Sequence, residues 1–287
     1  MRLSSGEKVF QVFLIGFILL VSAGMLYPFA HVLSISLSTT AESVRPGLHW
    51  YPHEISWFAW QRVVEDSNVW RALGNTVFRT IVGTFLTLLA LSMAAYPLSK
   101  KHLPHRSFYM MFIVVTMFFS GGLIPSYLLI KSLGLIDSRW VLIIPGLIST
   151  FSLLILRNFF MTLPEELEDS AKMDGAGDLR ILFTIILPLS KPVLATLALW
   201  SAVGHWNAWF DAMIYLQDQK LYVLQTFLRR LVIAAESDPL LPPKDETMAP
   251  ETVKAAVIMF TALPILIVYP FLQKYFVKGT LVGSIKG

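Results

Sequence analysis

The chain has 287 residues, of which 55% are hydrophobic and only 15% are charged, and its mean hydropathy is +0.63. Soluble domains carry about 25% charged residues, so this composition excludes an ordinary soluble protein and indicates an integral membrane protein. Cysteine is absent, which excludes a disulfide framework and a thiolate metal site. The net charge of +4 does not indicate nucleic-acid binding, because basic residues normally flank membrane spans on their cytoplasmic side.

Six apolar segments are long enough to cross a membrane, since a hydrocarbon core about 30 Å thick needs about 20 mostly apolar residues per helix. They comprise residues 10–33, 73–98, 108–130, 140–160, 189–214 and 253–277. The first follows the basic residues Arg2 and Lys8, but its apolar run exceeds the roughly 7 to 15 residues of a signal peptide, so an uncleaved anchor is expected. The sequence therefore predicts an all-α integral membrane protein with six transmembrane helices in one domain over residues 1–287.

The distribution of lysine and arginine indicates the orientation of these helices, because cytoplasmic loops are enriched in both. The basic residues of the second loop and the C-terminal tail are Lys100, Lys101, Arg106, Lys274, Lys278 and Lys286. The third loop holds only Lys131 and Arg139. We therefore expect both termini, the second loop and residues 162–191 in the cytoplasm, and residues 215–252 outside. Helically spaced leucines from Leu221 onward predict a surface helix in this outer segment, and a proline-rich stretch over 238–250 follows it.

Residues 162–191 form a polar segment between the fourth and fifth predicted spans. Thr162 and Glu165 have the spacing of a capping box, which predicts that a short helix begins there. Gly175 follows that helix and suits the left-handed conformation in which many helices end. Asp178 is placed to cap a second short helix over 179–187, which Pro188 follows. The pattern predicts two short helices joined by a turn outside the bilayer.

The same segment carries a spaced motif, whose members in chain order are Asp169, Ser170, Ala171, Gly175, Ile185, Leu187 and Pro188. It resembles the cytoplasmic-loop signature of the permease subunits of ATP-binding-cassette (ABC) importers. In that signature, Glu-Ala-Ala is followed at the same spacings by Gly, by Ile and by Leu-Pro. All spacings match, while Asp-Ser replaces the family's Glu-Ala pair.

Four further segments extend the resemblance to nearly the whole chain, namely residues 75–80, 121–140, 205–216 and 269–287. They are similar to sugar-importing permeases of the maltose type. The similarity is greatest to the branch that imports oligosaccharides and polysaccharide breakdown products, including alginate-type importers. The resemblance implies a permease subunit that forms half of a translocation pore in the bacterial cytoplasmic (inner) membrane.

The resemblance also implies partners for this subunit. These are a second, related permease in a heterodimer, two ATP-binding subunits, an extracytoplasmic sugar-binding protein, and the surrounding membrane lipid. ATP and magnesium are expected on the ATP-binding subunits, and no cofactor is expected on this chain.

The resemblance assigns residues 162–191 a role in coupling ATP hydrolysis to transport, since a short rigid helix can seat in a groove of the ATPase and move the spans that it joins. Leu167 and Ala171 share a helical face, and Ala171 and Gly175 permit close approach because neither is bulky. Asp169 and Asp174 are available to pair with basic residues of the ATPase; the alternative is a solvated helix face. The candidate coupling residues are Leu167, Glu168, Asp169, Ser170, Ala171, Asp174, Gly175, Ile185, Leu187 and Pro188.

The fifth predicted span ends in a cluster of aromatic and polar side chains that is a candidate for contact with sugar. Ligand pockets combine aromatic surfaces with a few placed polar groups, and the candidates are Trp206, Asn207, Trp209 and Asp211. Asn207 and Asp211 are four residues apart and are expected to share a helical face that turns away from lipid. The alternative is that the tryptophans belong to the aromatic belt at the membrane interface.

Other classes of protein fit the sequence less well. A membrane-embedded enzyme is not indicated, because the sequence has no His-Glu-x-x-His, Gly-x-Ser-x-Gly or Walker-type motif, and neither a metal site nor ATP hydrolysis by this chain is expected. A secondary carrier is expected to bury ionisable residues near mid-membrane, whereas the predicted spans are nearly free of charge at their centres. An ABC-importer permease for a non-sugar solute is the other alternative.

Overall fold

The computed structural model describes the backbone of residues 5–236 and 250–284, and the side chains of residues 6–230 and 251–268. Gly287 and nearly all of the proline-rich stretch over 238–250 lie outside the described backbone, and the lysines of the C-terminal tail lie outside the described side chains. The chain divides into two compact units, one of residues 1–70 with 228–264 and one of residues 71–227 with 265–287. The described residues are helical and contain no β-strand, only an isolated bridge between Ser38 and Ile55.

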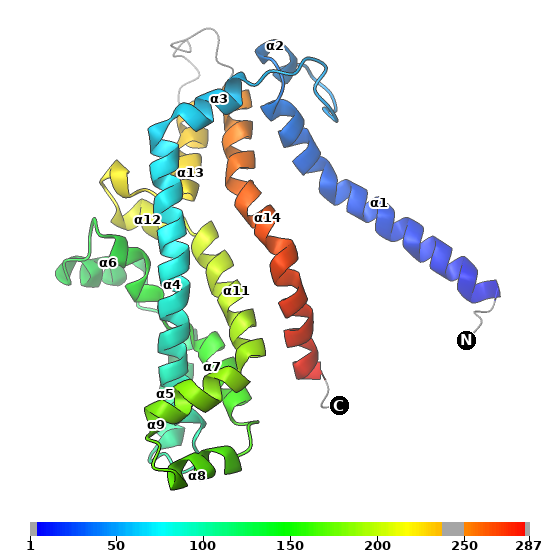
Figure 1. Ribbon diagram of the computed structural model, residues 1–287. Helices are drawn as coiled ribbons and strands as arrows, with labels where there is room; N and C mark the ends of the chain where they lie inside the picture. The colour runs from blue at the N-terminus through cyan, green and yellow to red at the C-terminus, as the bar shows by residue number, and fades with distance from the viewer. Residues whose placement is uncertain (1–4, 237–249, 285–287) are drawn as a thin grey trace. The chain divides into compact units, whose positions relative to one another are not determined.

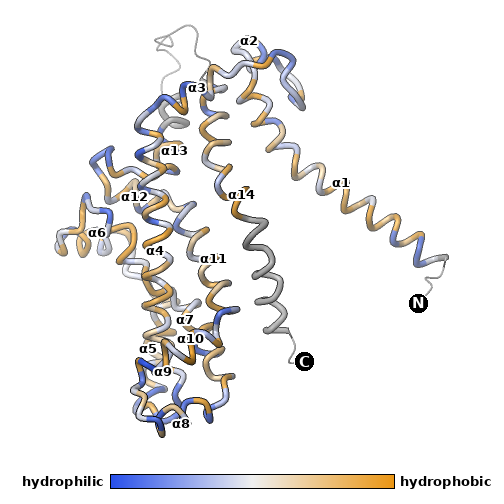
Figure 2. Tube along the Cα trace, in the orientation of Figure 1, coloured by the Kyte–Doolittle hydropathy of each residue, from blue (hydrophilic) through white to orange (hydrophobic). Residues whose placement is uncertain are grey.

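Three helices are each long and apolar enough to cross a membrane: α1 (Ser5–Ser36), α4 (Ser67–Ser99) and, over its described side chains, α14 (Pro250–Ser284) (Figure 1). Apolar helices are thereby confirmed at the first, second and sixth predicted segments. The apolar stretch of α1 is not buried at all within the chain, and hydrophobic residues line most of its length (Figure 2). Such a helix is suited to contact with lipid or with another subunit.

The third and fourth predicted segments are each bent. Helices α5 (Arg106–Phe118) and α6 (Leu123–Ser132) meet at 114°, and between them Gly122 has a φ of +88°, a conformation that glycine adopts readily. The 3₁₀ turns η1 (Arg139–Leu142) and η2 (Ile144–Gly146) meet α7 (Thr150–Phe160) at 52°. Pro145 lies in η2 and has no N–H to continue a helix. Each of these two segments counts as one span when its bent pieces are taken together.

The fifth predicted segment also differs from the observed helix. Helix α11 (Lys191–Asn207) follows residues 178–189 at an angle of 85° and ends before Ala208. Ala208 has an extended backbone, and a separate helix α12 (Phe210–Tyr215) then begins. The described residues thus contain three long apolar helices, or up to six spans when each bent pair is counted as one.

The unit of residues 1–70 and 228–264 contains α1, α2 (Thr40–Ser43), α3 (Phe58–Glu65) and the first part of α14. The indole Nε1 of Trp60 donates a hydrogen bond to Ser36 Oγ at 3.2 Å. The carboxylate of Glu42 accepts hydrogen bonds from the backbone N–H groups of His53 at 2.6 Å and Glu54 at 3.2 Å. These bonds fold the segment after α2 back onto that short helix.

Two buried apolar clusters lie among the described residues of the unit of residues 71–227 and 265–287. The larger joins α4, α7 and α11 to the segment after residue 178, through Leu91, Ala95, Tyr96, Leu98, Leu153, Leu156, Phe160, Ile181, Leu182, Ile186 and Leu197. The smaller joins α6, η1 and α12 to the turn η4 (Gln219–Leu221) and to Tyr222 and Val223. Helix α13 (Leu224–Glu236) follows directly and is the predicted surface helix with a later first residue. The larger cluster fixes the 162–191 segment on the helices that carry it.

Candidate functional site

The 162–191 segment begins with α8 (Glu166–Met173), and the predicted capping box does not form. The Thr162 hydroxyl donates to the carbonyl of Phe159 at 2.7 Å, because Thr162 follows the end of α7, where carbonyl groups lack helical partners. Glu165 occupies the cap position without a side-chain cap bond. Three acidic residues, Glu166, Glu168 and Asp169, still occupy the first turn, where they suit the positive end of the helix dipole.

Gly175 ends α8, as the sequence predicted. Its φ is +77°, its N–H donates to Lys172 O at 2.9 Å, and the N–H of Ala176 donates to Ala171 O at 2.9 Å. This pair of bonds is a Schellman motif, in which the left-handed residue is usually glycine. A Cβ at Gly175 would meet no other atom within 4 Å. Glycine is therefore favoured by the positive φ and not by crowding, and the space around this position is open to a partner protein.

The second short helix is longer than predicted and is not capped by Asp178. It begins at Asp178 after an extended Gly177, as α9 (Asp178–Ile181), passes through a π turn η3 (Leu182–Ile186) and closes as α10 (Leu187–Leu189). Pro188 lies within α10, in the last turn of this helix. Ile185 and Leu187 pack against the larger apolar cluster, so this half of the segment is part of the core.

Glu168 turns inward to the end of α4. Both carboxylate oxygens bind Lys100 Nζ, and the Tyr96 hydroxyl donates to Oε2 at 3.3 Å. The Lys100 ammonium also lies 4.2 Å from the centre of the Tyr96 ring. The side chains of Lys100 and Glu168 are only 18% and 12% exposed, so this is a largely buried ion pair that ties α8 to α4.

A second ion pair joins the same two segments at the surface. Lys101 Nζ lies 2.8 Å from Glu165 Oε1, and both side chains are exposed. The hydrogen bond from Lys101 lowers the pKa of the Glu165 carboxyl below its ordinary value. Because Lys100 and Lys101 belong to the second predicted loop, that loop and the 162–191 segment lie at one end of this unit, where polar residues gather (Figure 2).

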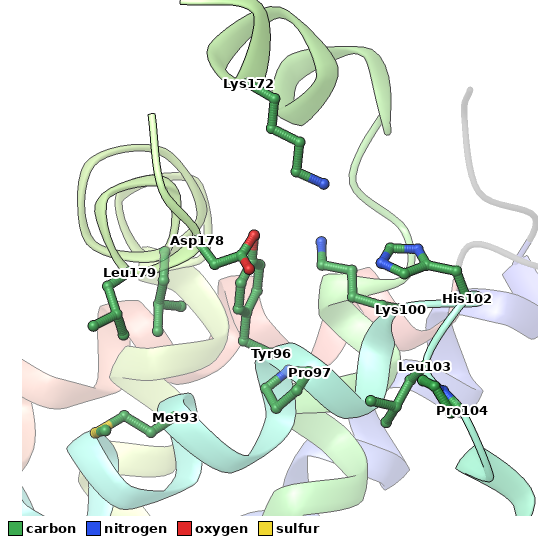
Figure 3. A pocket seen from close by; sticks show the side chains of 11 residues that line it. Met93, Tyr96, Pro97, Lys100, His102, Leu103, Pro104, Lys172, Asp178 and Leu179 are labelled. Atoms are coloured by element: carbon green, nitrogen blue, oxygen red, sulfur yellow. The ribbon is translucent and has the colours of Figure 1, made fainter. Parts of the chain in front are cut away.

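A hollow of about 320 Å³ separates α8 and the start of α9 from the end of α4 (Figure 3). The side chains of Lys172, Lys100 and His102 point toward one another across it, and Asp178 lies beside Tyr96. The remaining lining comes from Met93, Pro97, Leu103, Pro104, Leu179 and Leu182. The ion pair between Glu168 and Lys100 therefore joins α8 to the end of α4 beside this cavity and not within the apolar core.

The outward surface of α8 differs from the predicted contact face. Ala171 and Leu163 pack against the protein's own apolar cluster, whereas Leu167 is 41% exposed and Met173 is 88% exposed. The other exposed candidates on α8 and at its C-terminal end are Asp169, Ser170, Asp174 and Gly175. The exposed surface is thus acidic and polar, with Leu167, Met173 and the 63% exposed Leu179 as its apolar points.

A second polar assembly lies where α11 ends. Arg79 of α4 is 4% exposed, and its guanidinium forms a bidentate ion pair with Asp211, in which Nη1 and Oδ1 are 3.1 Å apart. Nη1 also donates to the Ala208 carbonyl at 3.2 Å, just beyond the negative end of the α11 dipole. Sequence reasoning missed this pairing, although Arg79 belongs to one of the segments that carry the family resemblance.

Two neighbours of Arg79 also hold distant backbone. Asn75 Nδ2 donates to the carbonyls of Lys220 at 2.9 Å and Tyr222 at 3.0 Å. The Thr76 hydroxyl accepts from the Leu224 N–H at 2.8 Å. Polar side chains within an apolar helix were a signal in the sequence that Asn75 and Thr76 bind something, since buried polar groups need partners. The sequence could not show which partners, because these are more than 140 residues away.

The four substrate-path candidates are not one surface. The chain leaves the helix at Ala208, so Asn207 and Asp211 do not share a helical face. Asn207 is exposed and donates to Val203 O of its own helix at 3.0 Å. Trp206 is buried and Trp209 is half-buried. The predicted common face of Asn207 and Asp211 is therefore wrong, and Asp211 binds Arg79.

The described residues hold no group of three or more His, Cys, Asp or Glu side chains that fits a metal ion. An all-helical chain with apolar spans and a structured polar segment at one end has the architecture of a membrane transport subunit. Residues 86–282 match the family described as "Binding-protein-dependent transport system inner membrane component". The chain belongs to this family, whose members are membrane components of ABC transporters.

Relatives match over almost the full length. The polygalacturonan/rhamnogalacturonan transport system permease protein YtcP of Bacillus subtilis (strain 168) is 40% identical over 98% of this chain and 99% of that protein. Protein LplC of the same organism is 42% identical over 100% of this chain and 98% of its own. A chain in the crystal structure of a bacterial ABC transporter involved in the import of the acidic polysaccharide alginate is 31% identical, with a TM-score of 0.88, and the match covers 96% and 99% of the two chains. These matches confirm the resemblance to ABC-importer permeases.

Proposed function

We propose that this chain is one permease subunit of a binding-protein-dependent ABC importer, and that it forms half of the translocation pore for oligosaccharides or polysaccharide fragments. The observation that carries this proposal is the full-length similarity to a permease named for polygalacturonan and rhamnogalacturonan transport. The likeness to a chain of an alginate importer supports the same class of substrate.

The subunit is proposed to work with a second, related permease, two ATP-binding subunits and an extracytoplasmic sugar-binding protein. The family description, which names a binding protein, supports the last of these. ATP and magnesium belong to the ATP-binding subunits, and this chain binds no cofactor. One transmembrane domain over residues 1–287 would cross the membrane six times, with both termini and the 162–191 loop in the cytoplasm and residues 215–252 outside.

Coupling is proposed to run through α8. Movement of the ATP-binding subunits would press on its exposed side, at Leu167, Asp169, Ser170, Asp174 and Gly175. The buried ion pair to Lys100 supports transmission to α4 through Glu168. Packing of Ala171, Ile185 and Leu187 on the larger apolar cluster supports transmission to α7 and α11. Pro188 then lies next to the 85° bend that leads into α11.

Among the substrate-path candidates, Asp211 is proposed to act through Arg79 and not by contact with sugar. Trp206, Asn207 and Trp209 are retained as residues beside the path, because they surround the break between α11 and α12.

The function is tested by reconstituting the chain with its partner subunits in liposomes and measuring ATP-driven uptake of trigalacturonate. Uptake that needs the binding protein supports the proposal; a cognate binding protein that binds no saccharide and delivers another solute overturns it. Gly175→Arg should uncouple ATP hydrolysis from uptake, because a long cation would stand where α8 faces the ATPase. Gly134→Arg is the matched control, since Gly134 also has a positive φ of +67° and open space around its Cβ position.

The orientation is tested with single cysteines, since the chain has none of its own. Cysteines replacing Asp178 and Glu54 are probed in intact cells with a membrane-impermeant thiol reagent. Labelling at 54 and protection at 178 are expected. Labelling of residue 178 from outside would contradict a cytoplasmic coupling loop.

A further inference from the structure

A cavity of about 370 Å³ lies between α4, α7 and α11, within the unit of residues 71–227. It is distinct from the hollow under α8 and has the size of a small ligand pocket. One face of α4 borders it with Arg79, Thr87 and Leu91, which recur at multiples of four residues. Helix α11 contributes Trp200 and Ser201 among others. The cavity is therefore bordered by three helices and, at Gly146 and Ser149, by the connection that leads into α7.

Two of its buried polar groups have no hydrogen-bond partner among the described residues. They are Nε of Arg79 and Oγ1 of Thr87, and these residues are only 4% and 7% exposed. Other buried hydroxyls on the same helices differ: Ser92 donates to Leu88 O at 2.7 Å and Thr196 to Pro192 O at 3.1 Å, whereas Oγ1 of Thr80 and of Thr84, away from the cavity, likewise has no partner among the described residues. Since an unpaired buried donor is costly, groups that border an open cavity mark a place for a ligand with polar atoms.

The charge of the cavity favours a hydroxyl-bearing ligand. The guanidinium of Arg79 is already neutralised by Asp211 through both terminal nitrogens, which leaves Nε as a donor without excess charge. Hydroxyl groups of Thr87, Ser152 and Ser201 line the same space. Such a set matches the hydroxyl groups of a sugar ring. A carboxylate on that ring needs an uncompensated cation, which Arg79 does not supply, so it would point out of the cavity.

The cavity also has an aromatic wall. Trp200 is 40% exposed and is stacked on Phe151, with ring centres 6.1 Å apart and an interplanar angle of 23°. The ring of His205 lies against Gly83, where a Cβ would come within 2.6 Å of Nε2. A flat apolar surface beside hydroxyl groups is the combination that suits a sugar ring.

The cavity lies deep along its helices. Trp200 is nine residues beyond the start of α11, or about 14 Å at 1.5 Å per residue. Thr87 is twelve residues before the end of α4, or about 18 Å. For helices that cross a core about 30 Å thick, this depth is near the middle.

We propose that this cavity is a subsite that holds one pyranose ring of the saccharide in transit, through its hydroxyl groups and against Trp200. The proposal rests on the proposed sugar-import function and adds a place of contact within this subunit. Trp200 precedes the Trp206 and Asn207 candidates by one to two turns of α11, whereas His205, which also lines the cavity, adjoins them.

The first test compares two isosteric changes in the reconstituted importer. Thr87→Val removes the unpaired hydroxyl and should lower uptake of trigalacturonate at subsaturating concentration about 5- to 10-fold, as expected for one lost hydrogen bond. Thr196→Val removes a buried hydroxyl that already bonds its own helix and should leave uptake unchanged. Equal uptake by the two variants would overturn the subsite, whereas failure of the wild-type importer to take up saccharide would overturn the proposed function itself.

The second test asks what occupies the cavity. Ser201→Cys in the assembled importer is treated with a small neutral thiol reagent, with and without trigalacturonate, and Ser126→Cys on α6 is the exposed control. Slower modification at 201 in the presence of saccharide, with no change at 126, supports the subsite. Modification at 201 that ignores saccharide would show a water-filled cavity only. Modification in the isolated chain but not in the assembled importer would show that the partner permease fills it, and either of these results overturns the proposal.

Discussion

The ion pair between Lys100 and Glu168 offers a direct test of how α8 is held. Lys100→Met removes the ammonium group and keeps an aliphatic stem, and it leaves the 12% exposed Glu168 carboxylate without its cation. Removing one partner of a buried ion pair costs about 3 to 5 kcal/mol. The remaining exposure and the Tyr96 hydroxyl, which still donates to Glu168, favour the lower end. We expect the attachment of α8 to weaken by about 3 kcal/mol.

Hydrogen–deuterium exchange of the assembled importer measures this loss locally. A cost of about 3 kcal/mol corresponds to an opening equilibrium larger on the order of 100-fold, so amides of α8 (Glu166–Met173) should exchange faster by about that factor. Peptides from α7 should not change. Lys101→Met is the matched control, because its pair with Glu165 is exposed and such pairs contribute little.

Two results would refute this reasoning. Exchange of α8 in Lys100→Met that equals the exchange in Lys101→Met would show that the buried pair does not hold the helix. The double variant Lys100→Met, Glu168→Leu should recover most of the protection, since replacing both partners of a buried pair by apolar groups is often close to neutral. A double variant as fast as the single one would show that the loss comes from the shape of Lys100 and not from its charge.

Three further predictions concern other contacts. Asp211→Asn leaves the 4% exposed Arg79 without its anion and should cost about 3 kcal/mol, seen as a lower thermal midpoint of the purified protein in detergent; an unchanged midpoint would contradict it. Gly175→Ala places a side chain at a φ of +77° and should cost about 1 to 2 kcal/mol, seen as faster exchange in α8, whereas Gly177→Ala should not, because Gly177 has an extended backbone. Glu42 accepts from the His53 N–H, and this bond lowers the pKa of the carboxyl below 4.5; the stabilisation is therefore present above 4.5 and lost as the pH falls through the lowered pKa. Limited proteolysis of residues 42–57 should be slow at pH 7 and should become faster as the pH falls below 4.5 and through the lowered pKa, and Glu42→Ala should remove this pH dependence.

Local patterns in the sequence were sufficient for the features that depend on neighbouring residues alone. Uninterrupted apolar runs gave helices at α1, α4 and α14, because length and hydropathy decide which segments leave water for a membrane. Gly175 ended α8, because the left-handed cap depends on one backbone conformation. The spaced motif from Asp169 to Pro188 was sufficient to indicate the family, because all of its members lie within one short segment.

Tertiary contacts decided the features that the local patterns mispredicted. The spacing of Thr162 and Glu165 predicted a cap for α8, but the Thr162 hydroxyl instead donates a hydrogen bond to the Phe159 carbonyl at the end of α7. Glu168 was expected on the surface that contacts the ATPase, but its carboxylate faces inward and binds Lys100, which is 68 residues away in the sequence.

Arg79 and Asp211 could not be paired by any periodicity, because they are 132 residues apart and meet only after α11 breaks at Ala208. A hydropathy pattern records which side chains must leave water or find a partner. Only the packing of α4, α7 and α11 determines which partner each polar group finds. The same packing leaves an open cavity beside the Thr87 hydroxyl, which has no hydrogen-bond partner among the described residues.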